Sequence, residues 1–280
     1  MDIRSDRGPW LGAALTAVAL ITGVRLVMLA FDHIDLFVDE SQYWLWGQNL
    51  DFGYYSKPPL IGWLIRLVTD LAGSDAPFWV RMPGAVLHGA TALILGALAA
   101  RLSGPRVAVW VAVSYVTTPL VAVGGLLIST DTVMAPFYAL ALYAWFRLVE
   151  TRARHWALLA GVAAGLAFMA KYVGAYFLLG AGLSALLVPA MRIGWRNGAI
   201  LLGAFAVVVA PNVVWNLTHG LATVYHTMDN IGISEEIGVV AEAPSEPGPS
   251  FANLFSFAAG QFAVFGPVLL AGLLAASLGA

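Results

Sequence analysis

Two adjacent carboxylates, Asp39 and Glu40, are the first residues in this sequence whose types and spacing could do chemistry. A carboxylate beside aromatic rings can serve as a general base when partial desolvation makes it more basic. Asp39, Tyr43 and Trp46 would share one face of an amphipathic helix over 39–49 because they follow i, i+4, i+7 spacing. On spacing alone, the favoured interpretation of the two acids is that they are solvated groups on a helix at the membrane surface.

The two lysines are the next candidates, since the other twelve basic residues are arginines. Lys57 lies between Ser56 and a Pro58-Pro59 corner, where a compact cation would suit a phosphate. Lys171 ends an apolar run and has the same possible role. The alternative for both lysines is an anchor whose long stem reaches the membrane interface.

Other polar residues stand at or inside the apolar segments. Asp131 lies at a helix junction, where an acid can cap the next helix and can also contact a substrate. Arg81 would pair with an acid or with a phosphate, because an unpaired charge in lipid is costly. His219 and His226 lie seven residues apart, which is no recognised metal-ligand spacing, so each is expected to be solvated or hydrogen-bonded.

The composition places most of the chain in lipid. Hydrophobic residues are 60% of the sequence and charged residues 11%, whereas soluble domains hold about 25% charged residues. A water-soluble surface, a disordered chain and a nucleic-acid-binding domain all need more charge than this. The absence of cysteine excludes disulfides, thiolate metal sites and a cysteine nucleophile. We therefore expect an integral membrane protein with no nucleic-acid partner.

Eight apolar segments approach or exceed the length needed to cross a bilayer core of about 30 Å as helices. They cover 10–31, 78–100, 107–128, 132–149, 156–170, 172–191, 198–217 and 254–280. The pattern predicts an all-α polytopic helical bundle of about eight spans, forming a single transmembrane domain over 1–280.

Two longer outer segments, 32–73 and 218–253, interrupt this series of spans. In the first, residues 60–71 are too short and too charged to span, which predicts a helix in the interface with Arg66 and Asp70 as an i, i+4 pair. The second is acidic and broken by three prolines, which is typical of a mobile loop or lid.

The distribution of charge predicts the orientation. With a cytoplasmic N-terminus, nine of the 14 Lys and Arg fall on the cytoplasmic side, and only three of the 16 Asp and Glu do. Both lysines then lie outside, against the general trend, which favours an anionic ligand on that face.

A series of short motifs follows along the chain, at positions consistent with the predicted spans. In order, they are Val38-Asp39-Glu40-Ser41-Gln42-Tyr43-Trp44, Tyr54-Tyr55-Ser56-Lys57-Pro58-Pro59-Leu60, Val80-Arg81-Met82-Pro83, Ser129-Thr130-Asp131-Thr132, Ala170-Lys171-Tyr172, Pro211-Asn212-Val213-Val214-Trp215-Asn216 and His219-Gly220. The series closely resembles the polyprenyl-phosphate-sugar-dependent glycosyltransferases of the protein O-mannosyltransferase and aminoarabinose transferase superfamily. Each motif alone is weak, but their order is specific, and the resemblance covers about residues 10 to 228.

The resemblance implies a GT-C fold, in which the first outer loop forms juxtamembrane helices around a cavity. It implies that Asp39 is the catalytic carboxylate, that Glu40 supports the same loop, and that Asp131 helps to form the active site. Lys57 matches the lysine that holds the lipid phosphate of the donor. The further positions at which we expect substrate contact are Tyr43, Tyr55, Arg81, Lys171 and His219.

The implied reaction is an inverting sugar transfer. Asp39 would deprotonate an acceptor hydroxyl, which attacks the anomeric carbon opposite the leaving polyprenyl phosphate, and Lys57 would offset the charge on that phosphate. Many relatives carry Glu before the Lys-Pro-Pro, where this chain has Ser56, and that Glu is linked to metal binding in some members. Ser56 therefore disfavours a divalent metal, which stays open as an alternative, and the sequence indicates no other cofactor.

The acceptor implied is an envelope glycolipid such as lipid A, a polysaccharide or a protein, and the location is the bacterial inner membrane with a periplasmic active site. A transporter or flippase for lipid-linked or anionic substrates is the leading alternative, although transporters usually bind near the midplane. A non-catalytic envelope subunit would fit the hydropathy but leaves Asp39 without a role. Since family members continue through more spans, we expect this chain to be the N-terminal part of a longer enzyme or a shortened relative.

Overall fold

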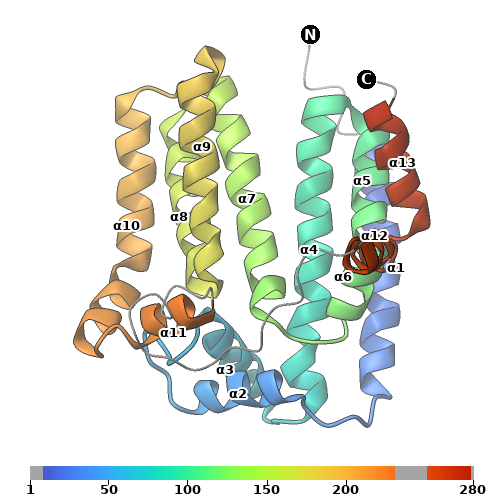
Figure 1. Ribbon diagram of the computed structural model, residues 1–280, viewed down its shortest axis with the longest axis vertical. Coiled ribbons are helices and arrows are strands. Elements are labelled where there is room, and N and C mark those ends of the chain that lie inside the picture. The colour runs from blue at the N-terminus through green and yellow to red at the C-terminus, as the bar shows by residue number, and fades with distance from the viewer. Residues whose placement is uncertain (1–8, 231–250, 279–280) are drawn as a thin grey trace.

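The computed structural model describes residues 9–230 and 251–278, and every regular element in these two ranges is a helix (Figure 1). The α-helices are α1 (Pro9–Ala30), α2 (Val38–Gln48), α3 (Leu60–Ala72), α4 (Pro77–Ser103), α5 (Pro105–Thr117), α6 (Pro119–Gly124), α7 (Thr130–Thr151), α8 (Arg154–Ala170), α9 (Tyr176–Leu187), α10 (Trp195–Thr218), α11 (Ala222–Asn230), α12 (Phe251–Phe265) and α13 (Pro267–Leu278). Two 3₁₀ turns, η1 (Tyr172–Ala175) and η2 (Pro189–Met191), flank α9.

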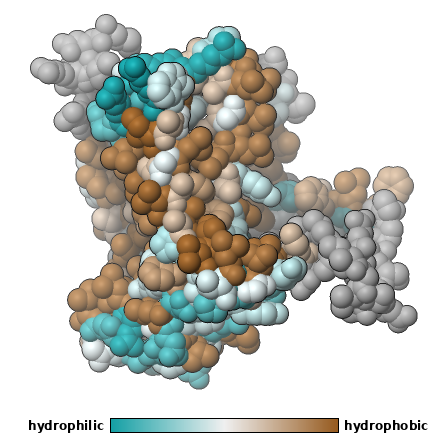
Figure 2. Space-filling view, turned by 90° about the vertical axis from the view of Figure 1, so that its left-hand side faces the viewer, coloured by the Kyte–Doolittle hydropathy of each residue, from teal (hydrophilic) through white to brown (hydrophobic). Residues whose placement is uncertain are grey.

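The long helices stand roughly parallel in two groups, with α1, α4 and α5 in one and α7 to α10 in the other (Figure 1). Packing of α4 against α7 joins the two groups. The short helices α2, α3 and α11 lie across one end of the bundle, at the lower edge of Figure 1. On the face shown in Figure 2, hydrophobic residues form the middle of the molecule, and hydrophilic residues gather towards its two ends.

Four of the described helices are long and apolar enough to cross a membrane: α1, α4, α7 and α10. Two shorter apolar helices, Arg154–Ala170 and Tyr172–Leu187, lie among them. These six match six of the predicted spans, and the all-α membrane fold that the sequence predicts is confirmed.

The other two predicted spans are each divided in the structure. In the segment 107–128, α5 ends at Thr117 and α6 begins at Pro119. The helix breaks there because proline has no N–H and its ring clashes with the preceding turn. The segment 254–280 is divided at Gly266, whose φ of 76° lies in the left-handed region. The expectation of one continuous helix in each segment was therefore wrong, because apolar length alone does not show where a helix breaks.

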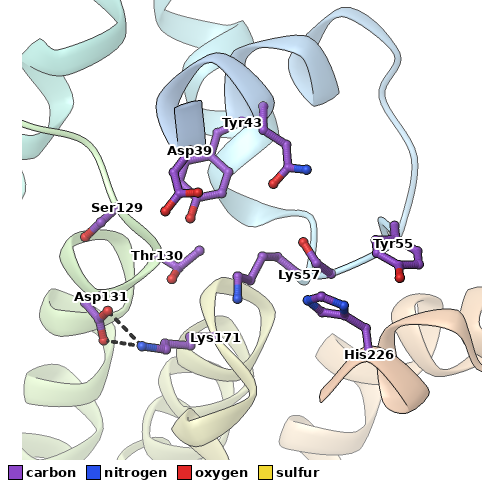
Figure 3. Close-up of a pocket in the computed structure, with 11 residues that line it drawn as sticks. Asp39, Tyr43, Tyr55, Lys57, Ser129, Thr130, Asp131, Lys171 and His226 are labelled. Atoms are coloured by element: carbon purple, nitrogen blue, oxygen red, sulfur yellow. Dashed lines mark hydrogen bonds and ion pairs between the residues drawn. The ribbon is translucent and has the colours of Figure 1, made fainter. Parts of the chain in front are cut away.

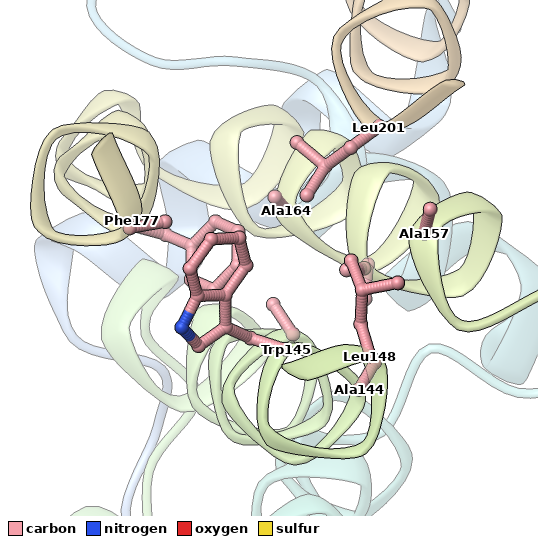
Figure 4. Packing of buried hydrophobic residues seen from close by; sticks show 11 residues of the cluster. Ala144, Trp145, Leu148, Ala157, Ala164, Phe177 and Leu201 are labelled. Carbon is pink, nitrogen blue, oxygen red and sulfur yellow. The ribbon is translucent and has the colours of Figure 1, made fainter. Parts of the chain in front are cut away.

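Small residues on α8 allow its neighbours to pack closely (Figure 4). Ala157, Ala160, Ala163 and Ala164 are fully buried between α7, α9 and α10, where Trp145 and Leu148 fill the remaining space. At Gly161, a Cβ atom would lie 2.2 Å from the backbone oxygen of Leu201 on α10, so only glycine permits this approach. Close contact between small residues is a main source of helix association in lipid.

The first outer segment forms the two juxtamembrane helices that the sequence predicts. α2 and α3 pack together, and Trp46 of α2 stacks on Tyr54 of the connecting loop with ring centroids 4.9 Å apart. Arg66 and Asp70 form the expected i, i+4 ion pair at 2.8 Å on the exposed side of α3. In the second outer segment the structure shows the helix α11, while the acidic, proline-rich part, residues 231–250, for which a lid was predicted, lies outside the described residues.

A buried ion pair connects the juxtamembrane helices to the bundle. The guanidinium of Arg81, in the first turns of α4, donates to the Glu40 carboxylate at 2.7 Å and to Asp32 at 3.0 Å. It also donates to the backbone oxygens of Ile34 and Asp35. The side chains of Arg81 and Glu40 are only 2% and 4% exposed, so this pair is shielded from water.

The Glu40 carboxylate is saturated by partners from three segments. Besides Arg81, it accepts the backbone N–H of Phe37 before α2 and the N–H of Ile128 before α7. One carboxylate therefore holds the starts of α2, α4 and α7 together.

Glu40→Gln is expected to lower the free energy of unfolding by about 3 to 5 kcal/mol, because it leaves the buried Arg81 charge without its main partner. Equilibrium unfolding of the full-length protein in micelles would measure the loss. Glu150→Gln is the matched control: Glu150 pairs with Arg101 and Arg147 but is 36% exposed, so its loss should cost at most about 1 kcal/mol. Equal stability of Glu40→Gln and the parent protein would contradict this structural role.

Candidate active site

A cavity of about 460 Å³ opens where the juxtamembrane helices meet the bundle (Figure 3). Eleven residues from α2, the 54–57 loop, the start of α7, the end of α8 and α11 line it. They are Asp39, Gln42, Tyr43, Tyr55, Ser56, Lys57, Ser129, Thr130, Asp131, Lys171 and His226. The cavity thus gathers six of the nine residues that the sequence singles out: Asp39, Asp131, Tyr43, Tyr55, Lys57 and Lys171.

Asp39 lies in the first turn of α2, and its carboxylate points into this cavity (Figure 3). The positive end of the helix dipole favours a negative charge at this position. Within residues 9–230 and 251–278, the Asp39 side chain takes part in no hydrogen bond or ion pair, so its oxygens are available to a ligand.

Tyr43 lies one helical turn after Asp39 and is 4% exposed. Burial raises the pKa of Tyr43 to about 12, and the negative charges of Asp39 and Asp131 add to that shift. Because the phenol stays neutral over the physiological pH range, Tyr43 can donate a hydrogen bond within the cavity.

Asp131 and Lys171 form an ion pair in the wall of the cavity, between α7 and the end of α8. The Lys171 ammonium donates to both carboxylate oxygens of Asp131, at 2.8 and 2.7 Å (Figure 3). Asp131 does not cap α7, which was one expectation from the sequence; Ser129 is the capping residue and accepts the N–H of Thr132 at 3.2 Å. The Asp131 carboxylate is thereby left to interact with Lys171.

Lys57 differs from Lys171 because no carboxylate within the described residues pairs with it. Its half-buried side chain extends into the cavity from the loop that precedes α3 (Figure 3). On one side of it, the ring of Tyr55 faces His226 of α11, with centroids 4.9 Å apart. An unpaired ammonium in a partly enclosed cavity is suited to an anionic ligand.

The C-terminal part of α10 and the start of α11 hold the loop that carries Lys57. Asn212, which is 1% exposed, donates to the backbone oxygen of Phe52 at 2.7 Å, and the buried Thr223 donates to that of Tyr54 at 2.6 Å. The Trp215 ring lies against Gly53, where a Cβ atom would approach it to 2.3 Å. These contacts join residues about 160 positions apart in the chain and fix the loop.

Three predicted site residues lie outside the cavity. Glu40 is buried behind Asp39 and bound to Arg81, so in this structure both residues hold the site together and neither lines the cavity. The sequence predicts that Arg81 pairs either with an acid or with a phosphate. In the structure its partners are the acids Glu40 and Asp32. His219 stacks on Trp215 with centroids 4.3 Å apart and hydrogen-bonds within the end of α10.

His226 is the main cavity residue that sequence reasoning did not select. It comes from α11, for which no helix was predicted, and it reaches the site because α11 packs over the 54–57 loop. Gln42, one residue before Tyr43, and the hydroxyls of Ser129 and Thr130 also line the cavity and stand inside the recognised motifs.

The described residues do not fit a divalent metal. Nowhere in that part of the chain do three His, Cys, Asp or Glu side chains gather closely enough to hold an ion. Ser56, at the position where the motif resemblance implies Glu in some relatives, supplies only a hydroxyl. We therefore derive no step through a metal.

Comparison with known proteins gives two matches. Residues 56–215, more than half of the chain, match the family described as dolichyl-phosphate-mannose-protein mannosyltransferase. The chain is also 43% identical, over 250 residues, to the lipid A galacturonosyltransferase RgtD of Rhizobium johnstonii, which covers 89% of this chain and 50% of that protein. No solved structure shows a significant match.

The chain therefore belongs to the dolichyl-phosphate-mannose-protein mannosyltransferase family of GT-C glycosyltransferases, as its motifs predict. It spans about half the length of the curated relative it matches.

Asn212→Leu should loosen the Lys57 loop, because it removes the donor to the Phe52 oxygen and leaves that acceptor unsatisfied. A loss of about 1 to 3 kcal/mol in local stability predicts amide exchange at residues 50–57 at least about fivefold faster. Hydrogen exchange with mass spectrometry measures this. Asn197→Leu is the matched control, since Asn197 is a buried asparagine at the opposite end of α10. Equal exchange at 50–57 in both variants would contradict the assignment.

Proposed function

We propose that this protein is an inverting glycosyltransferase that moves a sugar from a polyprenyl-phosphate donor to an envelope acceptor. The observation that carries this proposal is the pairing of charges in the cavity. Asp131 and Lys171 neutralise each other, while Asp39 and Lys57 face the same space with no counter-ion among the described residues. The cavity thus offers one free base and one free cation, which are the two groups that sugar transfer from a phosphate requires.

Asp39 is the proposed base. Its carboxylate takes the proton of the acceptor hydroxyl, whose oxygen then bonds to the anomeric carbon of the sugar. The bond between that carbon and the phosphate oxygen breaks on the opposite face, which inverts the centre. The neutral phenol of Tyr43, one turn away, can hold the acceptor or the sugar by a hydrogen bond.

Lys57 is the proposed phosphate ligand. The leaving phosphate gains negative charge as the bond breaks, so a fixed ammonium stabilises the transition state more than the ground state. Lys171 keeps the Asp131 carboxylate from adding a second free negative charge near that phosphate. Tyr55 and His226 form the wall beside Lys57 and are proposed to contact the donor.

The acceptor we propose is a lipid A-type glycolipid. Its support is the 43% identity to a protein named as a lipid A galacturonosyltransferase. The cavity also lies at the end of the bundle that carries the short helices α2, α3 and α11, so a membrane-embedded donor and acceptor can both reach it (Figure 1). Charge distribution supports a location in the bacterial inner membrane with this end in the periplasm.

Asp39→Asn is expected to lower the rate of sugar transfer by about 10² to 10⁴-fold, because the amide cannot accept the acceptor proton. The assay uses the full-length protein in proteoliposomes with a radiolabelled polyprenyl-phosphate sugar and lipid A. Asp70→Asn, which removes an exposed acid on α3, should transfer sugar at the parent rate. Unchanged transfer by Asp39→Asn would contradict its role as base.

Lys57→Met is expected to lower transfer by about 10² to 10³-fold, because it removes the cation that stabilises the leaving phosphate while keeping the length of the side chain. Arg66→Met is the control, since Arg66 is a cation of α3 outside the cavity. Movement of intact lipid-linked sugar across the bilayer, with no new glycosidic bond, would instead identify a transporter.

A further inference from the structure

A second cavity of about 490 Å³ lies on the other side of the bundle, between α1, α5 and α6. It shares no residue with the active-site cavity. Its walls are almost entirely apolar, and several of its lining residues, such as Leu20, Val24 and Val123, are more than half exposed on the side that would face lipid. A hydrophobic chain could therefore enter it from the bilayer.

Arg25 is the one charged residue in this lining. It lies in the C-terminal third of the apolar helix α1 and is 5% exposed. Its only hydrogen bond in the described part of the chain runs from Nη2 to the backbone oxygen of Val116, and its Nη1 is buried without a partner. A guanidinium carries five N–H donors, so most of its bonding capacity is unused.

The break in the helix at Pro119 explains why Arg25 sits here. α5 ends at Thr117, so the Val116 oxygen has no helical donor, and Arg25 supplies one. The guanidinium also lies against Gly125, where a Cβ atom would approach Nη1 to 3.0 Å. Glycine at this position leaves room for the guanidinium beside the cavity.

No acid among the described residues balances the charge of Arg25. The carboxylates of Asp32 and Glu40, at the same end of the bundle, are both engaged by Arg81. An uncompensated arginine inside a membrane helix is costly, and such residues mark sites for ions or anionic ligands. An anion that reached Arg25 would remove this cost.

The depth of Arg25 indicates what kind of anion this is. Arg25 precedes the end of α1, at Ala30, by five residues, or about 7.5 Å along the helix axis. This is the end of the bundle that carries α2 and α3, so Arg25 lies close to the boundary between headgroups and acyl chains (Figure 1). A lipid phosphate occurs at this level, and its hydrocarbon chains extend from it towards the middle of the bilayer.

We propose that the cavity between α1, α5 and α6 is a binding site for a phosphate-bearing membrane lipid. Its phosphate bonds to the guanidinium of Arg25, and a hydrocarbon chain lies along the apolar wall formed by Leu20, Val24 and Val123. The site is separate from the sugar-transfer cavity, and the proposal does not depend on the proposed reaction.

Native mass spectrometry of the full-length protein tests this with three probes: phosphatidylglycerol, monogalactosyldiacylglycerol with the same acyl chains, and inorganic phosphate. We expect retention of phosphatidylglycerol at least tenfold above the uncharged galactolipid, and no retention of inorganic phosphate alone. Arg25→Gln should abolish that difference, and Arg25→Lys should keep it. Arg66→Gln, which removes a half-buried arginine on α3 that lines neither cavity, should bind like the parent protein.

Ala122→Phe serves as a second variant, because Arg25→Gln also removes the donor to Val116 and could impair folding. It fills the cavity while the charge remains, and should lower phosphatidylglycerol retention by at least fivefold. Equal retention by the parent protein and both cavity variants would overturn the proposal. Equal retention of the two lipids, or binding of inorganic phosphate without lipid, would also overturn it.

Discussion

The buried ion pair between Arg81 and Glu40 is the interaction on which the active-site end of this protein depends. A charged pair this well shielded is stable only when each donor and acceptor is satisfied, and here the backbone of the 34–37 segment and of Ile128 completes the set. The starts of α2, α4 and α7 are thereby fixed relative to one another. Asp39 directly precedes Glu40 in the chain, and Asp131 comes three residues after Ile128. The positions of both acids therefore depend on this network.

The bundle contributes the second constraint. The close packing of α8 against α7 and α10 depends on alanine and glycine, and it brings Lys171, at the end of α8, opposite Asp131. The same packing aligns the end of α10 with the 49–57 loop, where Asn212 and Trp215 hold the backbone beside Lys57. The apolar core and the polar site therefore depend on each other. The packing of each helix in the bundle determines where the polar residues at its end lie.

The ionic residues in and around the two cavities differ in whether they have a counter-ion. Arg81 and Glu40 satisfy each other, and so do Lys171 and Asp131. Asp39, Lys57 and Arg25 find no counter-ion within the described residues, and all three line cavities. An unbalanced charge inside a membrane is unfavourable unless a ligand or another partner neutralises it. This physical argument underlies both the sugar-transfer site that we propose and the lipid site beside α1.

The sequence by itself determined the membrane class, the α-helical bundle, the two juxtamembrane helices and six of the cavity residues, because apolar length, helical spacing and motif order are local properties. The tertiary structure decided the rest. It paired Glu40 with Arg81 and placed His219 outside the cavity lining. It also brought His226 in and showed the breaks at Pro119 and Gly266. The pairs Arg81–Glu40 and Lys171–Asp131 join residues 41 and 40 positions apart, and Asn212 reaches Phe52 across 160 positions. No spacing along the chain contains the distances between such segments.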